Sequence, residues 1–147
     1  MAFSRDLKLF ATDEGSWVNG IGLRLWRIDD GKCIQVLNSG WENRPSVAFS
    51  SDSKLIALSA GKSVRLWLVE EGESIRTTQD DETKVNVLVL SHDSKLIASS
   101  GFNQVIRLWQ VGSGERTHIL ESEDGTAGAF DFAPDSNILA SAFHGGV

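Results

Sequence analysis

The chain contains one short segment three times, as Leu23-Arg24-Leu25-Trp26, Val64-Arg65-Leu66-Trp67 and Ile106-Arg107-Leu108-Trp109. The three tryptophans are spaced 41 and 42 residues apart. A fixed period of about forty residues is typical of a repeat array, in which each repeat forms one supersecondary unit. The period therefore indicates the architecture before any single residue is considered.

A second series of residues keeps the same period. In each repeat an apolar residue stands three positions before an aspartate, and a short apolar run follows. These pairs are Phe3 and Asp6, Phe49 and Asp52, Leu90 and Asp93, and Phe132 and Asp135. Because the two series stay in register along the chain, they support the repeat independently of each other.

Each repeat divides into four segments of strand length. In the second repeat the predicted strands cover residues 47–49, 55–60, 63–69 and 74–78. Asp52 lies in the first turn, where its side chain can accept a hydrogen bond from the backbone two residues later. Four antiparallel strands per repeat, arranged radially, predict an all-β fold of β-propeller blades.

These motifs resemble the WD-repeat family. The matching features are a Phe-Ser-x-Asp-x-Lys-Leu-x-Ala signal from Phe49, the Val-Arg-Leu-Trp strand, and the Gly-Glu pair before the outer strand. The resemblance implies a propeller that binds other proteins. The repeats are most similar to those of filamentous fungi, in NACHT-type signalling receptors or in the mitochondrial-division adapter.

The chain also departs from the family pattern. The aspartate that usually follows the tryptophan is replaced by Arg27, Leu68 and Gln110. The stretches before the inner strands contain no histidine, and the hairpin aspartate is replaced by Gly20, Gly61 and Asn103. The family's buried polar network is therefore incomplete, and we expect apolar packing alone to hold the blades together.

Counting strands predicts about three and a half blades in one partial propeller domain. Their approximate bounds are residues 1–40, 41–80, 81–123 and an incomplete 124–147. An incomplete ring leaves an apolar blade face open at each end. Two explanations remain open: the chain is part of a larger protein, or two copies close a seven-bladed ring. Both predict self-association of the isolated chain through its open faces.

The composition limits the possible partners and compartments. The 147 residues are 41% hydrophobic and 23% charged, with a net charge of −6, which is typical of a globular protein and unfavourable for nucleic-acid binding. No apolar stretch is long enough to span a membrane. Cys33 is the only cysteine, which excludes an internal disulfide and fits a reducing compartment. We expect a cytoplasmic protein without membrane insertion.

The chain offers no convergent catalytic group. His92 precedes a turn aspartate, His118 lies in a polar outer strand, and His144 lies in the last turn; we expect all three to be solvated. Cys33 is expected to be half-buried and has no neighbouring cation to lower its pKa. We therefore predict no catalytic, cofactor or metal site, and an enzyme remains only a remote alternative.

Recognition is better supported than catalysis. Three aromatic residues fall in loops that should meet at one rim of the propeller, namely Trp17, Trp41 and Phe102. Tryptophan is enriched among the residues that dominate binding energy at protein interfaces. The alternative is that these rings fold over the blades and cap them.

Acidic residues recur in the connections between successive blades, at Asp80, Asp81 and Glu82 and again at Glu123 and Asp124. They would share the rim with the aromatic residues and favour a basic partner. The alternative is a merely solvated edge. We predict a non-catalytic interaction scaffold or sensor module, with a partner-recruiting adapter as the alternative.

Overall fold

The computed structural model describes residues 1–16, 20–41, 45–79, 83–121 and 125–144. Within these ranges the chain forms β-strands joined by turns, and none of it is helical. The described residues accordingly include no helix that could cross a membrane. The all-β prediction is confirmed.

Four antiparallel sheets follow one another along the chain, each built from strands that are consecutive in sequence. The first contains β1 (Ala2–Phe3), β2 (Leu9–Ser16), β3 (Gly20–Arg27) and β4 (Cys33–Trp41). The second contains β5 (Val47–Phe49), β6 (Leu55–Ala60), β7 (Ser63–Leu68) and β8 (Ser74–Gln79). The third contains β9 (Val87–Leu90), β10 (Leu96–Ser100), β11 (Val105–Gln110) and β12 (Arg116–Glu121). The fourth has only β13 (Thr126–Phe132) and β14 (Leu139–His144).

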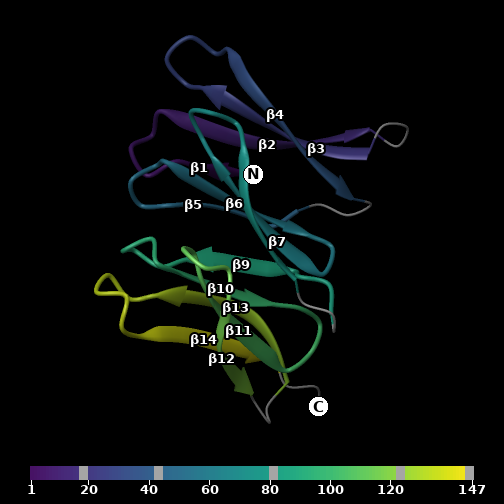
Figure 1. Cartoon of the computed structure of the whole chain (residues 1–147), viewed down its shortest axis with the longest axis vertical. Coiled ribbons are helices and arrows are strands. Elements are labelled where there is room, and N and C mark those ends of the chain that lie inside the picture. Colours follow the sequence, from purple (N-terminus) through teal and green to yellow (C-terminus); the bar gives the residue numbers. More distant parts are fainter. Residues whose placement is uncertain (17–19, 42–44, 80–82, 122–124, 145–147) are drawn as a thin grey trace.

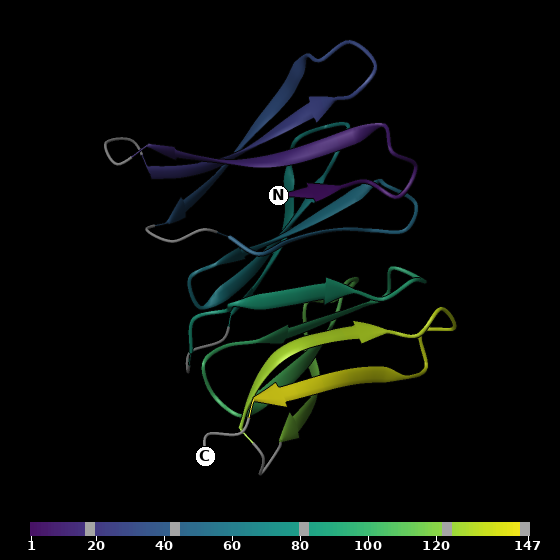
Figure 2. The same cartoon turned by 180° about the vertical axis from the view of Figure 1, so that it is seen from behind.

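The sheets stack face to face along the long axis of the molecule in sequence order, from the first sheet to the two-stranded fourth (Figures 1 and 2). The first strands of neighbouring sheets contact each other, β1 with β5, β5 with β9, and β9 with β13. This arrangement is that of propeller blades in a partial ring. The predicted fold class is confirmed.

Three apolar clusters hold the stack together, one at each junction between sheets. Leu23, Leu25 and Leu37 of the first sheet pack on Ile56 and Leu58 of the second. The next two clusters join the second sheet to the third and the third to the fourth. Their most buried members are Ala57, Val64, Leu66 and Ile97 in one, and Ala98, Ile106 and Ala127 in the other.

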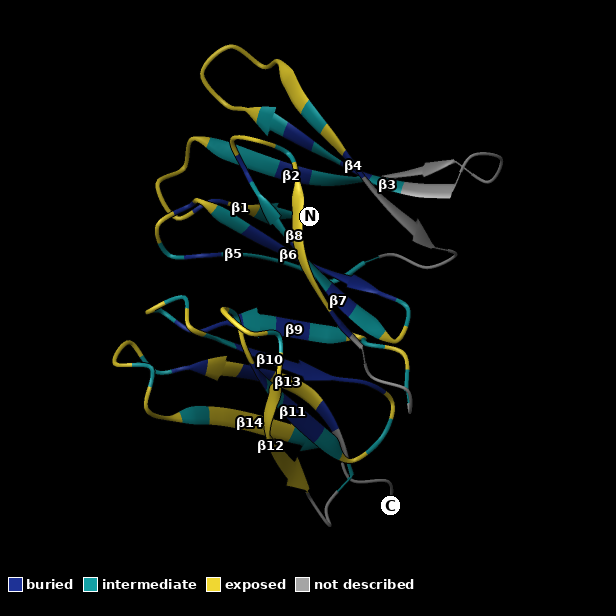
Figure 3. Ribbon diagram, in the orientation of Figure 1, coloured by how far each residue is buried: buried dark blue, intermediate teal, exposed yellow. Residues whose placement is uncertain are grey.

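The outer edge of the stack is solvated. All six residues of β12 are exposed, as the polar composition of the outer strands leads one to expect (Figure 3). The second strands β6 and β10 are instead buried along nearly their whole length. Continuous burial of these strands explains why their sequences do not alternate between apolar and polar residues.

No sheet formed by the described residues covers the far face of the first sheet. Phe3 and Phe10 stack on it with their ring centroids 4.5 Å apart, and Trp26 pairs with Phe10 in the ladder. Arg24 lies over the Trp26 ring at 5.9 Å from its centroid. In the third sheet the same positions belong to Leu90, Ile97 and Trp109, which are buried. The first sheet therefore exposes a face that its repeats normally bury, and Phe3 is 57% exposed.

The repeated tryptophans are anchored by hydrogen bonds as well as by packing. The indole nitrogen of Trp26 donates to Thr12 Oγ1, and that of Trp109 donates to Ser99 Oγ, each at 2.8 Å. Thr12 and Ser99 pair with the repeated arginines in their ladders, and Leu58 holds this position in the second sheet. The prediction of apolar packing alone is therefore wrong for two sheets, because a hydroxyl on the neighbouring strand replaces the missing polar network.

Trp67 is the exception. Its indole nitrogen is buried and has no hydrogen-bond partner, because Leu58 cannot accept a hydrogen bond. An unpaired buried donor costs free energy. Leu58 is fully buried in the cluster between the first two sheets, so apolar packing compensates at this junction.

A tight turn closes the first hairpin of each of the first three sheets by the same set of hydrogen bonds. In the second sheet the Ser50 hydroxyl donates to Asp52 Oδ1 at 2.6 Å and accepts from the Leu55 amide at 2.8 Å. The Lys54 amide donates to the same carboxylate at 3.1 Å, as the sequence predicts. Between them Ser53 has a φ of 61°, in the left-handed region.

The first and third turns repeat this geometry, with Ser4 and Asp6, and with Ser91 and Asp93. The serine hydroxyl, followed by the backbone amide, lowers the pKa of the Asp6, Asp52 and Asp93 carboxyl groups below its ordinary value.

The fourth turn lacks the serine. Ala133 takes its place, while the Asn137 amide still donates to Asp135 Oδ1 at 3.1 Å. In the other sheets the second strand begins at the residue that donates to the serine hydroxyl. Here β14 begins at Leu139, one residue after the equivalent Ile138. The missing hydroxyl is thus accompanied by a second strand that begins one residue later.

The topology argues against a ring of seven complete blades made from two copies. The fourth sheet holds a first and a second strand, β13 and β14. A second copy contributes a complete sheet, β1 to β4, and no third and fourth strand alone. Two copies placed end to end would therefore keep two incomplete sheets.

The tryptophan bonds lead to a test at matched positions. Ser99→Ala should lower the free energy of unfolding by about 1–3 kcal/mol, because it leaves the Trp109 indole nitrogen buried and unpaired. Thr12→Val should cost less, because Trp26 is half-buried and water can replace the hydroxyl. Urea denaturation of both variants measures the difference. Equal losses of unfolding free energy in the two variants would show that the burial of the indole nitrogen does not determine the cost of leaving it unpaired.

The turn leads to a second test. Ala133→Ser should raise the free energy of unfolding by about 1 kcal/mol, because the hydroxyl gives the Ile138 amide an acceptor. Ser91→Ala should lower it by about 2 kcal/mol through the opposite change. Hydrogen exchange at the Ile138 amide supplies the local readout. Unchanged exchange in Ala133→Ser would mean that the serine does not set the start of the strand.

Candidate interaction rim

The connections between sheets meet the hairpins between second and third strands at one end of the stack. The Val85 amide, in the connection from β8 to β9, donates to the Gly61 carbonyl of the β6–β7 hairpin at 2.7 Å. The neighbouring Asn86 amide donates to the Ser100 carbonyl of β10 at 2.8 Å. The connection is thus fixed on one side to the second sheet and on the other to the third.

Gly101 makes this arrangement possible. A Cβ atom at position 101 would lie 2.5 Å from the Lys84 carbonyl oxygen and would also meet the Thr83 side chain. The β10–β11 hairpin therefore approaches the connection more closely than a residue with a side chain allows. Gly61 and Gly101 both follow directly after a second strand, so their shared place in the repeat is a signal that sequence reasoning missed.

Phe102 lies in the same hairpin, where the sequence places it, and its side chain is 73% exposed. It does not fold over the sheet, so the capping alternative does not apply to this ring. An exposed phenylalanine beside a close-packed connection is a feature that a partner can bury.

Most of the other residues predicted for this rim cannot be placed. Trp17, Asp80, Asp81, Glu82, Glu123 and Asp124 lie outside the described residues. The described strands do show that the two acidic connections are equivalent, since each leads from a fourth strand to a first strand, β8 to β9 and β12 to β13.

The sequence pattern places Trp41 in a loop, and this prediction is wrong. Trp41 is the last residue of β4, where it pairs with Ile21. The physical reason is the first hairpin, whose strands extend to Ser16 and Gly20 and give β4 a longer edge to pair with. The length of the first hairpin therefore accounts for the place of Trp41 in a strand.

The histidines and the cysteine differ in part from their predicted settings. His118 lies in exposed β12 as expected, whereas His144 ends β14 rather than lying in a turn. Cys33 is exposed and not half-buried, because β4 is an outer strand. His92 is half-buried and its Nδ1 atom has no hydrogen-bond partner, so it is not a simple solvated turn residue.

The described residues contain no group of three histidine, cysteine or acidic side chains that could hold a metal ion. The described part of the rim offers backbone edges and an exposed aromatic ring. This arrangement suits the binding of another molecule's surface.

Comparison with known families gives one match. The family described as "WD domain, G-beta repeat" (WD40) matches residues 31–67 and again residues 72–110, which together make up more than half of the chain. The two matches run across the strands that carry Trp67 and Trp109. No curated protein matches the sequence.

Proposed function

Because the chain belongs to the WD40 family, we propose that it is a non-catalytic interaction scaffold whose rim of connections and hairpins binds a protein partner. WD40 repeat domains generally serve as protein-interaction scaffolds and are typically non-catalytic. The observation that carries the proposal is the exposed Phe102 on a hairpin packed against a fixed inter-sheet connection.

Preorganisation is the physical argument for this rim. The residue 83–86 connection is held by hydrogen bonds from Val85 and Asn86 to two different sheets. A surface that is already ordered loses little conformational entropy when a partner binds. Phe102 can therefore contribute its apolar area to the complex without first ordering the loop around it.

The proposed partner is basic, because acidic residues recur in the connections of the rim. These residues are Asp80, Asp81, Glu82, Glu123 and Asp124. They belong to connections that share the rim's place in the repeat. Negative charge at the edge of an interface mainly speeds the encounter with a positive surface. Trp17 and Trp41 are proposed as further aromatic contacts of the same partner.

We also propose a compartment and a larger protein for this scaffold. The chain would act in the cytoplasm, as the ligand-sensing end of a nucleotide-binding signalling receptor of the NACHT type. An adapter that recruits partners to mitochondrial division is the alternative. Both roles use the same rim and need no catalytic group.

The rim is tested with the whole chain immobilised to capture binding proteins from a cell lysate. Phe102→Ala should release a partner that wild type retains, whereas Leu7→Asn, at the opposite end of the stack, should not. Against the captured partner, Phe102→Ala should raise the off-rate. Reversal of Asp80, Asp81, Glu123 and Asp124 to lysine should slow the on-rate and weaken its salt dependence. A partner whose kinetics respond to neither change does not bind this rim.

Self-association through the open face of the first sheet is proposed as a separate property. Phe3, Phe10 and Trp26 form that face, whose equivalent is buried in the third sheet. Light scattering should show that the apparent mass rises with concentration, because exposed apolar faces associate. Phe3→Glu should reduce the rise, and Ile119→Glu on outer strand β12 should not. A wild-type monomer at every concentration contradicts this proposal.

A further inference from the structure

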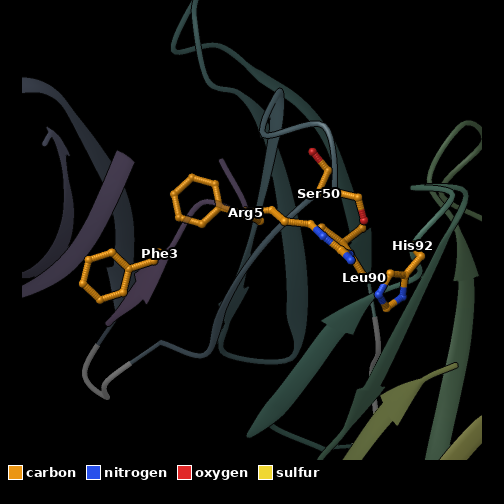
Figure 4. Close-up of a pocket in the computed structure, with 7 residues that line it drawn as sticks. Phe3, Arg5, Ser50, Leu90 and His92 are labelled. Atoms are coloured by element: carbon orange, nitrogen blue, oxygen red, sulfur yellow. The ribbon is translucent and has the colours of Figure 1, made fainter. Parts of the chain in front are cut away.

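A second candidate site lies at the end of the stack that carries the serine–aspartate turns, away from the rim. A cavity of about 340 Å³ opens there between the first three sheets (Figure 4). Its polar wall includes Arg5, Ser51 and His92, and its apolar wall includes Phe3, Phe49 and Leu90.

The polar residues of the cavity share one position in the repeat. Arg5, Ser51 and His92 each stand between the serine and the aspartate of their turn, in three successive sheets. The Ser–Asp hydrogen bonds fix the backbone on both sides of this position. The stacking of sheets then brings three residues that are more than forty positions apart to one cavity.

The Arg5 guanidinium and the Nδ1 atom of His92 lack partners within the described residues. Arg5 makes no hydrogen bond or ion pair with them, and the buried Nδ1 atom of His92 has no partner. Figure 4 shows the Arg5 side chain extending toward the turns that carry Ser50 and His92. An unpartnered guanidinium beside an unpartnered imidazole favours an anionic ligand.

The nearest carboxylates do not fill that role. Asp6, Asp52 and Asp93 each accept hydrogen bonds from the serine of their own turn and from a backbone amide two residues later. Their oxygens are thus engaged in holding the turns. An anion from outside the chain can still approach Arg5 and His92.

We propose that this cavity binds a carboxylate carried on an apolar group. Arg5 would bind the carboxylate in a bidentate manner, with the Ser51 hydroxyl and His92 as further donors. Phe3, Phe49 and Leu90 would pack against the apolar part. A small, strongly hydrated anion would leave these three side chains without a contact, so the apolar wall selects the larger ligand.

A peptide can supply a carboxylate next to an apolar group in two ways. It can come from the C-terminus of an apolar residue, or from an acidic side chain beside an apolar residue. The volume suits such an anchor, since it lies at the small end of the range for ligand sites. This site is independent of the proposed rim, and either can be wrong without affecting the other.

The probes are N-acetyl-phenylalanine, its C-terminal amide, N-acetyl-aspartyl-phenylalanine amide, and inorganic phosphate. Each is titrated into the isotope-labelled whole chain and followed by NMR at the Phe49 and Leu90 amides. At least one of the two carboxylates should bind about tenfold more tightly than N-acetyl-phenylalanine amide, because a charge-assisted hydrogen bond is lost in the amide. The tighter of the two acids identifies the source of the carboxylate.

Variants connect binding to the named residues. Arg5→Met should weaken binding of the preferred acid about tenfold, and Ser51→Arg should strengthen it by adding a cation at the same repeat position. Arg116→Met, on outer strand β12, is the matched control and should change nothing. Thermal unfolding of each variant confirms that it is folded.

Three results would overturn the proposal. The amide could bind as tightly as both acids, phosphate could bind as tightly as the acids, or Arg5→Met could bind as wild type does. The first shows that no carboxylate is recognised, the second that the apolar wall contributes nothing, and the third that Arg5 is not the anion's partner.

Discussion

A four-stranded sheet in this protein has two largely apolar faces, and only a neighbouring sheet can cover them. Each of the three buried clusters is built from two adjacent sheets and shares no buried residue with the other two. Stability is then a sum of contributions from neighbouring sheets, as in other repeat proteins. The rim and the cavity depend on this stacking, because each is assembled from residues of different sheets.

The hydrogen bonding of the repeated tryptophan differs from one sheet to the next. Trp109 and Trp26 donate to a hydroxyl, whereas Trp67 faces Leu58 and leaves its indole nitrogen unpaired. The junction between the first two sheets, to which Trp67 and Leu58 belong, thus has apolar contact in place of this hydrogen bond. The histidine and aspartate of the usual network are absent from the sequence. The first and third sheets have a hydroxyl that accepts from the tryptophan, whereas the second sheet has apolar contact at this position.

The two series in the sequence were sufficient to predict the sheets, because tryptophan spacing and the Ser–Asp turn report local geometry. They could not predict that Trp41 lies in a strand, since the length of β4 depends on how far the first hairpin extends. The sequence also did not predict that His92 lines a cavity, because residues of three different sheets form that cavity. The acidic rim residues fall outside the described chain, so their sequence signal stands alone.

The serine–aspartate turn leaves the residue between its two anchors free of any structural duty. That position holds arginine, serine and histidine in the first three sheets. In the fourth sheet, where Ala133 replaces the serine, it holds Pro134, and the turn keeps its left-handed residue at Ser136. Each repeat therefore presents one interchangeable side chain at the same end of the molecule. Evolution can vary the chemistry of that end one repeat at a time, without disturbing the sheets that carry it.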